Sequence, residues 1–68
     1  MTKFRFTYKN LENAFATMLG NSKFNTWYEL FDRETFEEEF AQFIGTTEEE
    51  LWKHKAFIAW YNEMAEEL

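Results

Sequence analysis

The first nine residues alternate between apolar and polar side chains. Between Thr2 and Lys9, Phe4, Phe6 and Tyr8 occupy every second position, and basic or hydroxyl residues fill the others. This period of two predicts a half-buried β-strand. A lone strand leaves its backbone groups unpaired, so we expect it to pair with another segment or with a second copy of the chain. The alternative is an extended arm packed by its aromatic side chains.

The spacing becomes helical from Leu11. Apolar residues recur at i, i+3, i+4, i+7 and i+8 as far as Leu19, which predicts an amphipathic helix. Asn10 is a suitable N-cap for this helix. Gly20 ends it, since glycine readily takes the left-handed conformation at a helix C-terminus.

Two stretches of the chain share one pattern. Residues 11–27 align with residues 36–52, and Glu, Phe, Ala, Gly and Trp recur at the same offsets. The pattern predicts two units of helix, glycine, cap and second helix, with Trp27 and Trp52 early in the second helix of each. It also favours a helix capped near Ser22 over a strand for residues 22–33. Chance convergence of two amphipathic helices is the alternative to a true duplication.

The second half of the chain carries clear helix boundaries. Thr35 and Glu38 have the spacing of a capping box, and an apolar stripe follows over residues 36–44. Gly45 ends that helix, and Thr47 caps the next one. No Gly or Pro occurs from Thr47 to the terminus, so we expect residues 47–68 to form the longest and central helix.

This last helix has two apolar arcs. Trp52 and Trp60 lie on the smaller arc with Ala56 and Ala59, apart from a broader arc that contains His54. The simplest interpretation is that both tryptophans pack on the N-terminal strand and the first helix. The alternative is a protein–protein surface, because Trp is a common interface anchor. The apolar residues of the broader arc are Leu51, Phe57, Ile58, Tyr61, Met64, Ala65 and Leu68.

Length and composition bound the fold. The 68 residues predict a single small domain over 1–68, near the lower size limit for a stable core. Nine Phe, three Trp and three Tyr offset the small size, because each ring buries a large apolar area. The predicted class is mostly α, at the margin of α+β: a short N-terminal β-strand followed by three to four helices. Absence of Cys and of any long apolar run favours a cytoplasmic protein without membrane contact.

Charge is the strongest compositional signal. Thirteen acidic residues face seven basic ones, a net charge of −6. Residues 1–10 carry +3, whereas residues 29–50 hold nine acids against Arg33 alone, a net of −8. Such a chain should repel nucleic acid and anionic membranes and attract basic proteins. The candidate partner-binding residues are Asp32, Glu34, Glu37, Glu38, Glu39, Glu48, Glu49 and Glu50.

The two glutamate triplets allow two interpretations. Residues 37–39 and 48–50 each begin a predicted helix, where the helix dipole stabilises carboxylates by about 0.3–1 kcal/mol, and this suffices as a structural explanation. The functional interpretation is that these carboxylates together imitate a track of phosphates and fill a basic groove on another protein.

No catalytic, metal or cofactor signature is present. His54 is the only histidine and there is no cysteine, so we interpret His54 as a hydrogen-bonded structural residue. The acids after Asp32 lack the glycine of a calcium-binding loop, and the two glycines do not form a phosphate-binding loop. We therefore expect neither enzymatic activity nor a cofactor or metal.

Two functions follow from these observations. The first is a small acidic inhibitor that occupies the basic surface of a nucleic-acid-handling protein by DNA mimicry, by compositional analogy with proteins of phages and mobile elements. The second is a homodimeric interaction or assembly module that uses the face of Trp52 and Trp60. Loss of binding at high salt would favour the first.

Overall fold

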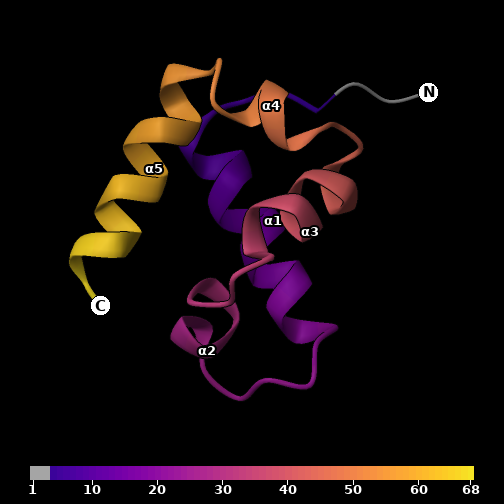
Figure 1. Cartoon of the computed structure of the whole chain (residues 1–68), viewed down its shortest axis with the longest axis vertical. Helices are drawn as coiled ribbons and strands as arrows, with labels where there is room; N and C mark the ends of the chain where they lie inside the picture. Colours follow the sequence, from indigo (N-terminus) through magenta and orange to yellow (C-terminus); the bar gives the residue numbers. More distant parts are fainter. Residues whose placement is uncertain (1–3) are drawn as a thin grey trace.

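The computed structural model describes residues 4–68 and consists of helices joined by short connections (Figure 1). The mostly-α class is therefore confirmed, whereas no strand is present in residues 4–68. No helix in this part of the chain is long and apolar enough to cross a bilayer. The elements are α1 (Tyr8–Gly20), α2 (Trp27–Phe31), α3 (Phe36–Ile44), α4 (Glu48–Leu51) and α5 (Lys55–Glu66).

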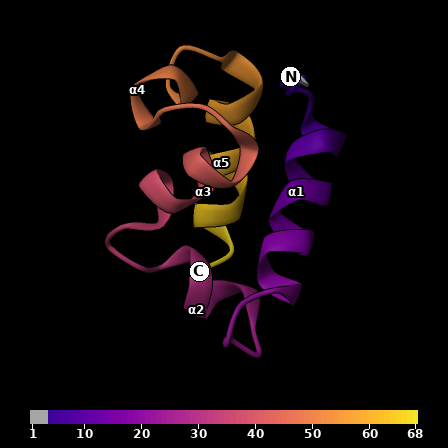
Figure 2. The same cartoon turned by 90° about the vertical axis from the view of Figure 1, so that its right-hand side faces the viewer.

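The first helix holds the others together. α1 packs against α2, α3 and α5, and α4 packs against α3. Figures 1 and 2 show α1 and α5 running in the same direction from the end of the molecule that carries α4 towards the end that carries α2. The Cα radius of gyration is 11.2 Å, close to the roughly 11 Å typical of a folded domain of this length.

Aromatic rings fill the space between the helices. Trp60 is completely buried and stacks on Phe40 with 5.4 Å between ring centroids, while Phe15 meets it edge-on at 5.5 Å. Every helix contributes at least one buried side chain, so the core forms only when all five are assembled. Its members are Leu11, Phe15, Leu30, Phe31, Phe36, Phe40, Ala41, Leu51, Phe57 and Trp60.

The predicted N-terminal strand is wrong: as in the alternative, residues 4–7 form an arm packed by its aromatic side chains, with a tight turn at Phe6 where the Thr7 amide donates to the Arg5 carbonyl at 3.0 Å. Phe4 and Phe6 are half-buried while Arg5 and Thr7 are exposed, so the alternation does report burial. Phe6 stacks on His54 with parallel rings 3.7 Å apart, and Phe4 meets Phe6 edge-on. The stack of Phe6 on His54, rather than strand pairing, therefore attaches the arm to the rest of the protein. Residues 2–3 of the predicted strand lie outside the described residues.

A local cap ends the extended arm early. α1 begins at Tyr8 because the Thr7 hydroxyl accepts a hydrogen bond from the Asn10 amide at 3.1 Å. Asn10, the expected N-cap, is therefore already inside the helix. The expected left-handed glycine is also wrong at Gly20, since Gly45 is the only residue with positive φ in the described part of the chain.

Residues 22–33 are helical only in part. The choice of helix over strand is confirmed for α2, which starts at Trp27, five residues after the predicted cap Ser22. The Ser22 hydroxyl instead shapes a turn: it donates to the Leu19 carbonyl at 2.7 Å and accepts from the Phe24 amide at 3.1 Å.

The two ends of α3 differ in how well the sequence predicts them. Gly45 has φ 85°, and the Thr46 and Gly45 amides donate to Ala41 and Gln42, as in a Schellman motif. The predicted glycine stop is thus confirmed. The predicted capping box is wrong, because the Thr35 hydroxyl donates to the carboxylate of Glu39 at 2.9 Å and caps no backbone amide.

The predicted long C-terminal helix is broken. α4 ends at Leu51, and α5 starts after His54, whose backbone is extended (φ −103°, ψ 121°). On a continuous helix, Leu51 and Trp60 would point about 180° apart, because nine residues turn the helix two and a half times. The break lets both side chains enter one core. α5 is consequently 12 residues long, one fewer than α1, and it is not the longest helix.

Candidate functional site

The eight candidate acidic residues lie on three consecutive elements. Asp32 ends α2, Glu34 lies in the connection that follows, and the two triplets occupy the first turns of α3 and α4. Because α4 packs on α3, the two triplets belong to neighbouring helices. The structure therefore brings the two triplets onto adjacent helices, while Asp32 and Glu34 follow α2 towards the other end of the molecule.

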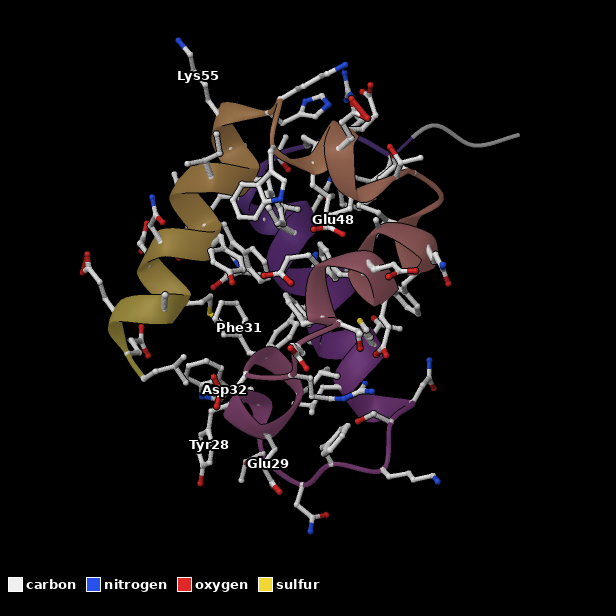
Figure 3. The ribbon with its side chains drawn as sticks, in the orientation of Figure 1. Tyr28, Glu29, Phe31, Asp32, Glu48 and Lys55 are labelled. Atoms are coloured by element: carbon white, nitrogen blue, oxygen red, sulfur yellow. The ribbon has the colours of Figure 1, made fainter. Side chains whose placement is uncertain are left out.

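One recess joins the two triplets. Glu38 and Glu48 line a cavity of about 230 Å³ between α3 and α4. Figure 3 shows Glu48 between the ribbons of these two helices. The lining combines apolar and polar groups, so the recess offers two carboxylates beside apolar groups. The remaining lining residues are Ala41, Gln42, Thr46 and Thr47.

Local sequence chemistry positions this recess. The Schellman motif at Gly45 reverses the chain. The Thr47 hydroxyl then accepts a hydrogen bond from the Glu50 amide at 3.2 Å, and this cap starts α4. Glu38 and Gln42 are one turn apart on α3, so they lie on the same side of that helix. The turn at residues 45–47 thus returns Glu48 to the side of Glu38.

Three of the eight carboxylates are engaged within the protein. Glu37 accepts a hydrogen bond from the Tyr61 hydroxyl at 2.6 Å and so links α3 to α5. Glu39 pairs with Arg33, and Glu50 pairs with Lys53 at 3.1 Å. Sequence reasoning grouped all eight acids together and did not identify these partners. The i,i+3 spacing of Glu50 and Lys53 was a usable signal, but nothing in the sequence marks Tyr61 as the partner of Glu37.

The other five carboxylates make no hydrogen bond or ion pair with residues 4–68. All five are exposed, so their oxygens are available to a partner. They carry the negative charge that the intramolecular pairs do not compensate. These residues are Asp32, Glu34, Glu38, Glu48 and Glu49.

The negative charges of Glu37 and Asp32 affect the ionisation of Tyr61. Burial raises the pKa of its phenol to about 12, aided by the hydrogen bond to Glu37 and by the negative charges of Glu37 and Asp32. Tyr8 of α1 is comparable: its hydrogen bond to Glu63 of α5, at 3.0 Å, raises the pKa of that phenol, and desolvation adds to the effect. Both phenols remain hydrogen-bond donors to glutamate at neutral pH.

The two tryptophans proposed as an apolar interface have different environments. Trp60 is completely buried and packs on Phe15 of α1, so it cannot contact a partner in this fold. Trp52 is 40% exposed and packs on Phe57 and Tyr61 rather than on the N-terminal arm. An apolar interface here would rest on Trp52 alone. Trp60 Nε1 has no hydrogen-bond acceptor within residues 4–68.

His54 has a structural role that differs from the expected one. Its ring stacks on Phe6, and its backbone carbonyl accepts the first hydrogen bond of α5, from the Ile58 amide at 3.1 Å. The side chain has no hydrogen-bond partner in the described residues, so stacking takes the place of the predicted hydrogen bond. Across residues 4–68, no three His, Cys, Asp or Glu side chains are grouped to hold a metal ion.

Comparison of the chain with protein-family models, with curated proteins and with solved structures found no match.

Proposed function

We propose that this protein is a small acidic binding module that inhibits a nucleic-acid-handling protein by occupying its basic surface, in the manner of a DNA mimic. The observation that carries the proposal is the set of five exposed, uncompensated carboxylates on α3, α4 and the segment that follows α2. Glu38 and Glu48 of this group flank one recess. The proposal assigns the protein to the cytoplasm and gives it no catalytic, metal or cofactor chemistry.

Physical chemistry favours a basic protein as the partner. With a net charge of −6, the chain is repelled by nucleic acid and by anionic membranes. A basic groove that normally binds phosphates attracts the same surface over roughly a Debye length, about 8 Å at physiological ionic strength. Such a complex forms rapidly and weakens as salt is added.

Two variants of equal net charge test whether the position of the charge matters. Glu38→Gln, Glu48→Gln and Glu49→Gln together change the net charge from −6 to −3 on the proposed surface. Glu12→Gln, Glu66→Gln and Glu67→Gln make the same change on α1 and at the end of α5. Each bait is used to capture partners from the source cell, and mass spectrometry identifies them.

We expect the first variant to lose roughly tenfold in affinity for the captured partner, since three charge pairs at about 0.5 kcal/mol each correspond to that factor. The second variant should bind nearly as well as the original protein. Equal loss in both variants would mean that only total charge matters. Binding that is independent of salt would contradict the proposal.

Self-association through Trp52 is the second candidate, favoured by the exposure of that indole. It predicts a dimer that dissociates when Trp52 is replaced by Ala. Sedimentation velocity at several protein concentrations tests this, and a monomer at all concentrations would exclude it.

A further inference from the structure

Trp52 is an exposed aromatic side chain that its neighbours hold in position. It follows α4 in the break before α5, and 40% of it is exposed. The rings of Phe57 and Tyr61 meet the indole edge-to-face at 5.0 and 5.1 Å between centroids. These two contacts restrict the indole, so little conformational freedom is lost when a partner binds to its exposed part.

One carboxylate contacts the same aromatic cluster, and a second acts on it through its charge. The hydroxyl of Tyr61 donates to Glu37, which uses one carboxylate oxygen for this bond and leaves Oε1 without a partner in the described residues. Asp32 lies close enough for its charge to act on the same phenol, and it has no partner within residues 4–68. Figure 3 shows Asp32 and Phe31 on the side of α2 that faces α5, whereas Tyr28 and Glu29 point away from the body.

The aromatic contacts of Tyr61 continue into the core. Tyr61 packs on Phe31 with 4.8 Å between centroids, so Trp52, Tyr61 and Phe31 form a continuous series of rings from α4 to α2. We call Trp52, Tyr61, Asp32 and Glu37 the aromatic–acidic site. It combines a partly exposed indole with two negatively charged carboxylates, of which Glu37 contacts Tyr61.

This combination matches one side chain in particular. A guanidinium group stacks on an aromatic face and at the same time donates several hydrogen bonds to carboxylates, and it is more weakly hydrated than an ammonium group. A lysine would gain the charge attraction but not the planar stacking. An uncharged apolar side chain would leave Asp32 and Glu37 without a counter-charge.

The arginine that follows Asp32 in the sequence already has partners within the protein. Arg33 pairs with Glu39, and its guanidinium lies over the ring of Phe24, 5.5 Å from the centroid. The lysine next to Trp52 in sequence, Lys53, pairs with Glu50. Neither side chain compensates the charge of Asp32 or Glu37.

We infer that the aromatic–acidic site receives an arginine side chain from the surface of a basic partner protein. The inference rests on the proposed function, because it specifies which residue of the basic partner is read. The arginine site differs from the proposed function because binding there depends on the indole of Trp52 as well as on charge. A pure phosphate mimic would have no use for Trp52.

Two basic peptides of equal charge provide the test. Hexa-arginine and hexa-lysine amides are titrated into the intact protein at low ionic strength, and the affinities are measured by calorimetry. We expect the original protein to prefer hexa-arginine by roughly threefold or more, which corresponds to an exposed cation–π contact. Trp52→Ala should bring the ratio of the two affinities close to one, and Trp52→Phe should retain part of the preference.

Phe43→Ala is the matched control. Phe43 is also exposed, at 43%, but it lies six residues after Glu37 on α3, roughly 120° around the helix. This variant should keep the arginine preference. In NMR spectra of the original protein, hexa-arginine should shift the indole N–H resonance of Trp52 more than that of buried Trp60, a readout that does not depend on any variant folding.

The outcomes separate the two proposals. An arginine preference that survives Trp52→Ala, or an unshifted Trp52 resonance at saturation, overturns the arginine site even if acidic binding itself persists. Failure of the protein to capture any nucleic-acid-binding partner would instead overturn the proposed function while leaving a measured peptide preference intact.

Discussion

Residues 11–27 and 36–52 carry nearly the same pattern, yet they end in different structures. Each begins with an apolar residue and places a Phe four positions later in the core: Phe15 in the first segment and Phe40 in the second. They differ after the helix. The first segment continues through a long turn into α2, with Trp27 as its first helical residue, while the second reverses at once and leaves Trp52 after α4.

The difference lies in the glycines. Gly45 takes positive φ and turns the chain within one residue, whereas Gly20 remains right-handed and Asn21 ends α1. A tight reversal presses α4 against α3 and brings the glutamate triplets together. The same sequence pattern thus fixes which rings are buried but not how the chain leaves the helix.

The largest expected effect tests the shared part of the pattern. Phe15→Ala and Phe40→Ala should each destabilise the fold by about 3–5 kcal/mol, because both rings are buried against Trp60. A loss of that size approaches the total stability of a domain this small, so both variants should be largely unfolded by circular dichroism. Phe43→Ala should change stability by less than about 0.5 kcal/mol. A stable Phe40→Ala protein would contradict the assigned core.

Replacing each glycine by alanine should give opposite signs. Gly45→Ala forces a side chain into a left-handed conformation and should cost about 1–2 kcal/mol. Gly20→Ala should stabilise the protein by about 0.5–1 kcal/mol, because Gly20 is helical and nothing lies within 4 Å of an added Cβ. Urea denaturation measures both. The same sign for both substitutions would show that the two segments end alike.

The hydroxyls at equivalent positions, Ser22 and Thr47, should also respond differently. Thr47→Ala removes the cap of α4 and should cost about 1 kcal/mol, while Thr47→Ser should retain most of the stability. Ser22→Ala should leave α2 intact, because α2 begins at Trp27 and Ser22 makes no cap for it. Amide hydrogen exchange distinguishes the two: Thr47→Ala should accelerate exchange at Glu50, and Ser22→Ala at Phe24.

The last effect appears only at alkaline pH: burial of Tyr61, aided by its hydrogen bond to Glu37 of the second segment, raises the pKa of its phenol. The pKa of Tyr61 rises from 10.0 to about 12 on folding, so the folded state holds its proton more tightly than the unfolded state. The resulting stabilisation is complete below pH 10 and is lost as the pH rises towards 12. Tyr61→Phe should reduce this alkaline decline, measured by urea denaturation at pH 9 to 12. Part of the slope should remain until Tyr8→Phe is added, because the pKa of Tyr8 is also raised. An unchanged slope in the double variant would contradict the assignment to these phenols.

Periodicity predicted the parts of this fold that depend on local sequence. The helical spacing of Leu11 and Phe15, the glycine stop at Gly45 and the cap at Thr47 all follow from properties of neighbouring residues. The break at His54 could not be predicted in this way, because it is required by the meeting of Leu51 and Trp60 in one core. No Gly or Pro marks it, and helix propensity alone favours continuation.

The candidate surface was predictable in composition but not in arrangement. The excess of acids between residues 29 and 50 is visible in the sequence. Which carboxylates remain uncompensated depends on tertiary contacts: Tyr61 reaches Glu37 from 24 positions away. The same applies to Trp52 and Trp60, which share an arc on an ideal helix and are separated by the break.

Competition with DNA tests the central claim most directly. A captured partner is first saturated with this protein. A duplex DNA that the partner binds is then titrated into the complex at fixed ionic strength. If the acidic surface on α2, α3 and α4 occupies the nucleic-acid site, DNA displaces the protein, and each ligand lowers the apparent affinity of the other in proportion to its concentration. A stable ternary complex of partner, DNA and this protein would contradict the account.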